Sequence, residues 1–111
     1  MKESPIFAKT YDFIKWLIPL TVKFPRHQRF VVAQALQQSA LDLQSRLFEA
    51  VRLPDTCYRL QLADVELDKL RFYIRLSTDL QYIDLGQQRH AAQLLSEIGR
   101  MLGSWQKKLD H

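Results

Sequence analysis

Apolar residues recur at three- and four-residue steps through four long segments of this chain, expected at residues 5–22, 26–52, 56–81 and 85–109. Sustained alternation and Asn-Gly or Asp-Gly hairpin turns, which would indicate strands, are missing from the sequence. Four helices with such seams pack around one core, so the spacing predicts an all-α, antiparallel, up-down-up-down four-helix bundle. The expected core residues are Phe7, Tyr11, Ile14 and Ile18; Ala33, Leu36, Ala40, Leu43 and Leu47; Leu60, Ala63, Leu67, Leu70 and Ile74; and Ala91, Leu94, Ile98, Met101 and Trp105.

Short junctions with capping residues and prolines separate the four segments. The signals are Ser4 with Pro5, Phe24 with Pro25, Asp55 with Thr56, and Asp84 with Gln87. The last pair has the spacing of a capping box, and a proline after a capping residue is typical of a first helical position. Pro19 lies inside the first segment, where it removes a backbone donor and predicts a kink.

The length of 111 residues fits one domain, expected to span residues 1–111. Hydrophobic residues make up 47 % and charged residues 25 %, the balance of an ordinary globular chain. No run of 18 apolar residues and no small-residue cleavage pattern occurs, so neither a membrane span nor a membrane partner is expected. With Cys57 as its single cysteine, the chain is expected in the reducing cytoplasm.

The third segment has more apolar residues than one core stripe can use. The additional residues are Tyr58, Leu62, Val65, Phe72, Tyr73 and Leu76. A helix that is apolar on more than one face is buried on more than one face, and a bundle of four helices has a single core. The surplus therefore favours an oligomer, and the alternative is a monomer with a wide stripe and a few exposed aromatic residues.

Patterns that would indicate an enzyme are missing. No glutamate is followed by histidine at the Glu-x-x-His spacing of bundle metal sites, and no glycine-rich phosphate loop or nucleophile elbow occurs. The three histidines have no partner at ligand spacing. We therefore expect no catalytic residue, no metal and no cofactor.

The net charge of +4 and several local clusters of cations make a polyanion the candidate partner. The candidate nucleic-acid contacts are Arg26, Arg29, Arg71, Arg75, Arg100, Lys107 and Lys108. An arginine can hold a phosphate with two parallel hydrogen bonds, whereas a lysine makes a looser contact. The alternative is local: Arg71 could pair with Asp68, Arg75 with Asp79, and the last cations suit the helix C-terminus.

Two of the three glycines lie inside the last predicted helix, where each costs about 1 kcal/mol relative to alanine. Gly99 and Gly103 continue a stripe of small residues with Ala92 and Ser96, beside Trp105 of the core seam. Such a stripe predicts close packing, either against a helix of the same bundle or against a neighbouring subunit.

Four stretches, PIFAKTYDFIKWLIPLTVKFPRHQRF, ALDLQSRLFEA, LDKLRFYIRLSTDL and LLSEIGRMLGSWQK, resemble the accessory variability protein (Avd) of diversity-generating retroelements. The resemblance covers residues 5–108, and its most specific parts are KFPRHQRF and IGRMLGSW. It implies a four-helix bundle assembled into a homopentameric barrel. It also implies a non-catalytic partner of a reverse transcriptase that binds RNA or DNA and supports mutagenic cDNA synthesis. The cations named above would then contact nucleic acid or the polymerase.

Two other functions remain open at this point. The wider superfamily includes four-helix proteins encoded in intervening sequences of bacterial 23S ribosomal RNA genes, so the chain could be associated with ribosomal RNA. Alternatively, it could be an oligomeric scaffold that binds only proteins and whose cations make surface pairs.

Overall fold

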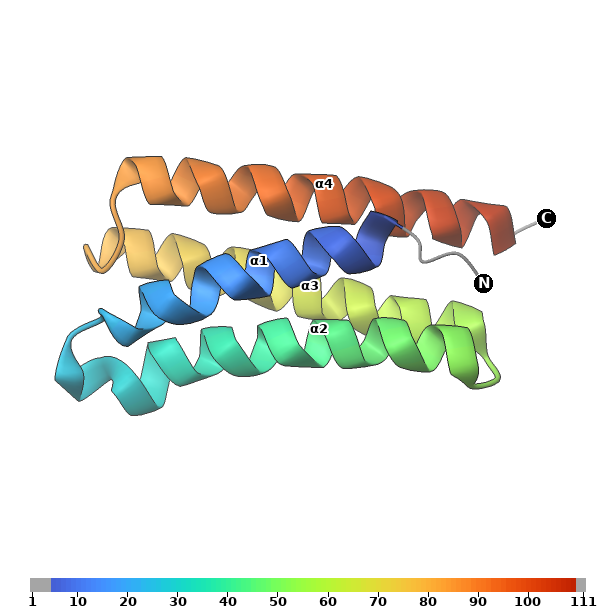
Figure 1. The fold of residues 1–111 in the computed structure, drawn as a ribbon, viewed down its shortest axis with the longest axis horizontal. Coiled ribbons are helices and arrows are strands. Elements are labelled where there is room, and N and C mark those ends of the chain that lie inside the picture. Colours follow the sequence, from blue (N-terminus) through green and yellow to red (C-terminus); the bar gives the residue numbers. More distant parts are fainter. Residues whose placement is uncertain (1–4, 110–111) are drawn as a thin grey trace.

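A computed structural model describes residues 5–109, except the side chains of Gln28 and Arg29, and the described residues form helices joined by short turns. The elements are α1 (Pro5–Val22), the 3-10 helix η1 (Arg26–Gln28), the π-helix η2 (Arg29–Ala33), α2 (Gln34–Arg52), α3 (Thr56–Asp79) and α4 (Leu85–Leu109). Successive α-helices run antiparallel, and the α1–α2 and α3–α4 junctions lie at the end of the bundle away from the described chain ends (Figure 1). This confirms the all-helical four-helix bundle.

Two helix boundaries differ from the predicted ones. The second segment becomes an α-helix only at Gln34, because a 3-10 turn and a π-helix occupy the residues after Pro25. Helix α3 ends at Asp79 rather than at residue 81, because Gln81 adopts a left-handed backbone with φ of 65°. The N–H of Tyr82 then donates to the Ser77 carbonyl at 2.8 Å, which closes the end of the helix.

The capping signals have mixed outcomes. Ser4 lies outside the described residues, and Pro5 is the first residue of α1. The predicted capping box is confirmed: the N–H of Gln87 donates to Asp84 Oδ1 at 2.8 Å, and the N–H of Asp84 donates to Gln87 Oε1 at 2.9 Å.

The expected cap before α3 is wrong. Asp55 has a left-handed backbone (φ of 63°) and makes no side-chain hydrogen bond to the helix start. The hydroxyl of Thr56 instead donates to the carbonyl of Ala50 at 3.2 Å, which ties the start of α3 to the end of α2. Pro19, which the sequence analysis expected to disturb the first helix, does not end it: α1 continues through Pro19 to Val22.

The predicted core stripes of the second and third segments are confirmed, since all ten residues are buried. In α1 the predicted stripe is confirmed only at Phe7: Tyr11 is exposed, and Ile14 and Ile18 are half-buried. The buried row instead runs through Ile6, Thr10, Phe13, Leu17 and Thr21. The hydroxyls of these threonines donate to the carbonyls of Ile6 and Ile18 at 2.7 and 2.8 Å. A satisfied hydroxyl can enter a core at little cost, which hydropathy alone does not show.

In α4 the core line is displaced by one residue from the predicted one. Leu95 and Leu102 are fully buried, whereas Leu94, Met101 and Trp105 are half-buried and pack against the edge of the core. The displacement turns the small residues of α4 toward α3, and this orientation shapes the groove described below.

The apolar surplus of α3 divides into two halves: Leu62, Tyr73 and Leu76 are half-buried, the last two packed against the core, and the other three residues lie on the surface. Tyr58, Val65 and Phe72 follow one another at seven-residue steps and are all exposed by half or more. Seven residues are nearly two helical turns, so the three side chains form one apolar row along the outside of α3. Within one chain this row has no cover.

Candidate functional site

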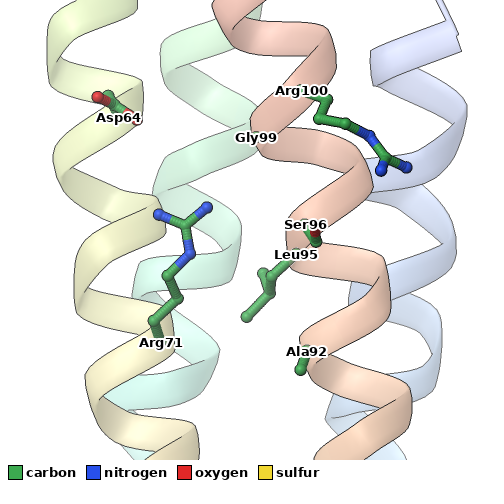
Figure 2. Close-up of a pocket in the computed structure, with 7 residues that line it drawn as sticks. All are labelled: Asp64, Arg71, Ala92, Leu95, Ser96, Gly99 and Arg100. Carbon is green, nitrogen blue, oxygen red and sulfur yellow. The ribbon is translucent and has the colours of Figure 1, made fainter.

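An open groove of about 420 Å³ runs between α3 and α4, because the side of α4 that faces it has small residues. Ala92, Ser96 and Gly99 form the α4 wall, with Leu95 of the core below them. The residues that line the groove are Asp64, Arg71, Ala92, Leu95, Ser96, Gly99 and Arg100 (Figure 2).

Gly99 makes room for a guanidinium group. A Cβ atom added at this position would lie 2.7 Å from Nη2 of Arg71, too close for both to keep their places. Figure 2 shows the Arg71 side chain projecting from α3 toward Gly99, while the Arg100 side chain extends from α4 on the side away from Arg71. The close neighbour of Gly99 therefore comes from the same bundle, but it is a flexible side chain rather than a backbone.

The second glycine of the stripe is different. A Cβ at Gly103 would have no atom within 4 Å among those described, so close packing within the bundle is wrong for this position. Packing against a neighbouring subunit stays a prediction for Gly103. Trp105 packs on the core edge and does not line the groove.

Arg71 has a weak local partner. Its Nη1 lies 3.2 Å from Asp68 Oδ1, one helical turn back, as the sequence predicted. Both side chains are well exposed, and an exposed pair of this kind contributes about 0–1 kcal/mol, so the guanidinium stays available to another anion. The other predicted pair is wrong: within residues 5–109, Arg75 makes no ion pair with Asp79.

The outer side of α4 presents cations without acidic partners. Arg89, Arg100, Lys107 and Lys108 are exposed, and none has a carboxylate within 4 Å in the described part of the chain. Steps of 11 and 7 residues bring Arg89, Arg100 and Lys107 to one side of the helix, with about 16 and 10 Å of helix axis between them. Arg89 is not among the contacts predicted from the sequence, although its 11-residue step to Arg100 places the two on one side of the helix. We call Arg71 and these four cations the basic groove; of the five, only Arg71 and Arg100 line the open groove itself, which Asp64 also lines.

The single acidic residue of α4 is neutralised elsewhere. Glu97 Oε2 lies 2.7 Å from Nζ of Lys9 on α1, and Gln93 donates to Oε1 at 3.4 Å. The hydrogen bond from Lys9, and then that from Gln93, hold the pKa of Glu97 below its usual value. The same hydrogen bond raises the pKa of Lys9. The charge of Arg100 also lowers the pKa of Glu97, so Arg100 is partly compensated by its own helix, although no carboxylate of the described residues lies within 4 Å of it.

The remaining predicted contacts lie apart from the groove. Arg26 is exposed in η1, at the end of the bundle where α1 meets α2 (Figure 1). The side chain of Arg29 lies outside the described residues. Arg75 lies one turn beyond Arg71 on α3 and is exposed.

The arrangement offers charge and shape rather than reaction chemistry. Residues 5–109 contain no group of three or more histidine, cysteine, aspartate or glutamate side chains that could hold a metal ion. Over the same residues, no helix is long and apolar enough to cross a membrane. What the arrangement can do is hold anions by charge: the guanidinium of Arg71 inside the groove, and the exposed cations along the outer side of α4.

A family model described as bAvd-like matches residues 6–109 of the chain. The chain belongs to the bAvd-like family. This agrees with the resemblance to Avd seen in the sequence, and the match includes the whole basic groove. No curated protein matches the chain.

A solved structure has a similar fold. A crystal structure of a protein of unknown function from the S23 ribosomal protein family of Bacteroides thetaiotaomicron superposes with a TM-score of 0.86. The two chains are 22 % identical, and the alignment covers 96 % of this chain and 99 % of the other. At that identity the likeness shows a shared four-helix fold.

Proposed function

We propose that this bAvd-like chain is the non-catalytic accessory protein of a diversity-generating retroelement. It binds the element's reverse transcriptase and its RNA or DNA in the cytoplasm and supports mutagenic cDNA synthesis. The observation that carries the proposal is family membership over residues 6–109 in a chain whose basic groove has no carboxylate of α4 within 4 Å of its cations.

The basic groove and Arg75 are the main contact with nucleic acid in this proposal. Phosphates follow α4 from Arg89 to Lys107 and Lys108, and Arg71 enters the groove from α3. Arg26 and Arg29 make a second contact at the end of the bundle. Each neutralised phosphate releases counterions, so the affinity should fall steeply with salt.

We also propose that several copies assemble, as a homopentamer by the family resemblance. The apolar row of α3 supports assembly, because exposed apolar rows mark interaction surfaces. Gly103, where an added Cβ would meet none of the described side chains or other helices within 4 Å, is a candidate point of close subunit approach. Five copies would carry +20 together, five times the +4 of one chain, and repeated weak phosphate contacts gain from multivalency.

The test of nucleic-acid binding is the salt dependence of affinity for the retroelement's template RNA, measured by fluorescence anisotropy. The logarithm of the binding constant should fall linearly with the logarithm of salt concentration, with a slope of about −0.7 per single-strand phosphate contact. Absence of binding at low salt, or binding that salt does not change, contradicts this part of the proposal.

A second candidate, a scaffold that binds the reverse transcriptase only through apolar contact, is favoured by the exposed apolar row. The two are separated by capturing purified reverse transcriptase on the immobilised chain. If Val65→Glu with Phe72→Glu abolishes capture while Arg71→Gln with Arg100→Gln leaves both capture and RNA affinity unchanged, the scaffold is correct. Light scattering of the same variants shows whether the apolar row holds the assembly.

A further inference from the structure

The end of the bundle where α1 meets α2 presents an aromatic ring to solvent. The Phe30 side chain is 79 % exposed, the largest exposure of any large hydrophobic residue among those described, and Val31 beside it is also exposed. Both belong to the π-helix η2, in which the next two residues, Val32 and Ala33, are buried. Packing within one chain therefore explains the second half of η2 and leaves Phe30 without a structural role.

The backbone of η2 is itself unusual. π-helical turns are rare and are frequently found at functional sites. Here the π-helix directly follows the 3-10 turn η1, so two irregular segments precede the regular helix α2. The exposed ring is thus carried by an uncommon local conformation, whereas the regular part of α2 buries its apolar seam.

The sequence around Phe30 has basic residues and no acidic ones. Lys23, Arg26 and His27 are exposed nearby in the sequence, and residues 13–41 contain no aspartate or glutamate. The acidic groups at this end belong to the α3–α4 junction: Asp79 is exposed, and Asp84 lines a separate open cavity and caps α4. The positive side of this end is therefore the one formed by the α1–α2 junction.

A flat exposed ring among cations matches one class of polyanion. Proteins that bind single strands combine cations for the backbone with aromatic side chains on which unpaired bases stack. Bases inside a duplex are already stacked and cannot reach such a ring. Two copies of this end placed face to face would bring like charges together, which disfavours a symmetric contact of this end with itself.

We infer that this end of the bundle binds single-stranded nucleic acid, with an unpaired base stacked on Phe30 and neighbouring phosphates on Lys23 and Arg26. The inference rests on the proposed function and adds to it a preference for unpaired over paired nucleic acid. The basic groove then follows the phosphate backbone, and the α1–α2 end recognises bases that are not paired.

The test uses a short fluorescein-labelled oligouridylate and, as the paired probe, an RNA duplex of equal length. Phe30→Ala should weaken binding of the oligouridylate about 5- to 100-fold, leave duplex binding unchanged, and leave the salt slope unchanged. Phe30→Trp should keep the affinity of the parent chain. Lys23→Gln with Arg26→Gln should instead reduce the salt slope by about 1–2.

Exposed Val31, next in the same π-helix, gives the matched control: Val31→Ala removes apolar surface at this end without removing a ring. If Phe30→Ala and Val31→Ala have equal effects, or if Phe30→Ala weakens duplex and single strand alike, base stacking is wrong. If Phe30→Ala affects only capture of reverse transcriptase, the ring is a protein contact and the inference is also wrong. In each of these cases salt-dependent RNA binding through the basic groove can persist, so the proposed function is tested separately.

Discussion

Helix α3 faces α2 on one side and α4 on the other, and the cations on the two sides have different surroundings. On the α2 side, Lys69 lies 3.5 Å from the buried Glu66. Arg59 lies 4.0 Å from Glu49 of α2, and Arg46 of α2 lies 3.3 Å from the same carboxylate. The positive charge between α2 and α3 is therefore compensated within the chain.

On the α4 side the compensation is weak or missing. Arg71 has only exposed Asp68 beside it, and Arg100 has no carboxylate within 4 Å among residues 5–109. Both sides have cations, and both have carboxylates nearby, since Asp64 also lines the groove without an ion pair within 4 Å. The presence or absence of a partner distinguishes cations that stabilise the bundle from cations available to a ligand.

Apolar packing differs in the same way. Leu67 of the α3 seam is fully buried, whereas Ser96 on the groove wall is exposed. We expect Leu67→Ala to lower the free energy of unfolding by about 2–5 kcal/mol, because it removes buried methyl groups and leaves a cavity. Ser96→Ala should change it by less than about 0.5 kcal/mol. Urea unfolding followed by circular dichroism measures both, and equal effects would show that the groove is as tightly packed as the seam.

The next effect concerns binding rather than stability. Arg71→Gln with Arg100→Gln should weaken RNA binding about tenfold or more, because each lost charged hydrogen bond contributes about 1.5–3 kcal/mol when it is made. The slope of affinity against salt should become shallower by about 1–2. Fluorescence anisotropy at several salt concentrations measures both quantities.

A matched control has the same change in net charge, from +4 to +2. Arg46→Gln with Arg59→Gln removes two cations that are paired with Glu49. This control should leave the salt slope near that of the parent chain. If both double variants lose affinity equally, the protein binds through its overall charge and the basic groove has no special part.

The sequence predicted the fold wherever apolar spacing and burial agree. Every predicted core residue of the second and third segments is buried, because leucine and alanine at helical steps have no competing partner. In α1, Thr10 and Thr21 are buried because their hydroxyls donate hydrogen bonds to carbonyls of the same helix. A hydropathy pattern counts threonine as polar and therefore does not predict its burial. The π-helix at Arg29–Ala33 was missed because one extra residue per turn leaves the approximate helical spacing intact.

The sequence predicted most residues of the candidate site but not how they lie relative to one another. Arg71, Gly99 and Arg100 were all named from the sequence, yet nothing in a linear pattern places Gly99 opposite Arg71. The position of Gly99 opposite Arg71 depends on how α3 and α4 are aligned. The missing side chain of Gly99 leaves the space that the guanidinium of Arg71 occupies. The 11-residue step from Arg89 to Arg100 is visible in the sequence, but the sequence does not show that Arg89 is exposed with no carboxylate within 4 Å among the described residues.

The two glycines of α4 give a smaller and more selective test. Gly99→Ala and Gly103→Ala should each raise the free energy of unfolding by up to about 1 kcal/mol, because alanine favours a helix. Only Gly99→Ala should also reduce RNA affinity, since its methyl group would lie where Nη2 of Arg71 now lies. Thermal unfolding and anisotropy on the same samples separate the two effects. Equal affinity for both variants would mean that Arg71 binds RNA from another position.

The smallest expected effect is the contribution of the Lys9–Glu97 ion pair to stability and its dependence on pH. The pKa of Glu97 is lowered by its hydrogen bonds, so the Lys9–Glu97 pair stabilises the fold above the usual carboxyl pKa of 4.5. That contribution is lost as pH falls through the lowered value. The pKa of Lys9 is raised, so the lysine part is present below 10.5 and is lost at higher pH.

Glu97→Gln should therefore lower the urea midpoint slightly at pH 7 and have less effect as pH falls through the lowered pKa of Glu97, because the carboxylate of the parent chain is then protonated as well. Asp68→Asn is the control, because it breaks the exposed pair with Arg71, which joins no two helices. A difference between Glu97→Gln and the parent chain that does not change with pH would show that Glu97 acts through packing. In that case the Lys9–Glu97 pair would contribute no stability through charge. The cations paired with Glu49 between α2 and α3 would then differ even more from those of α4.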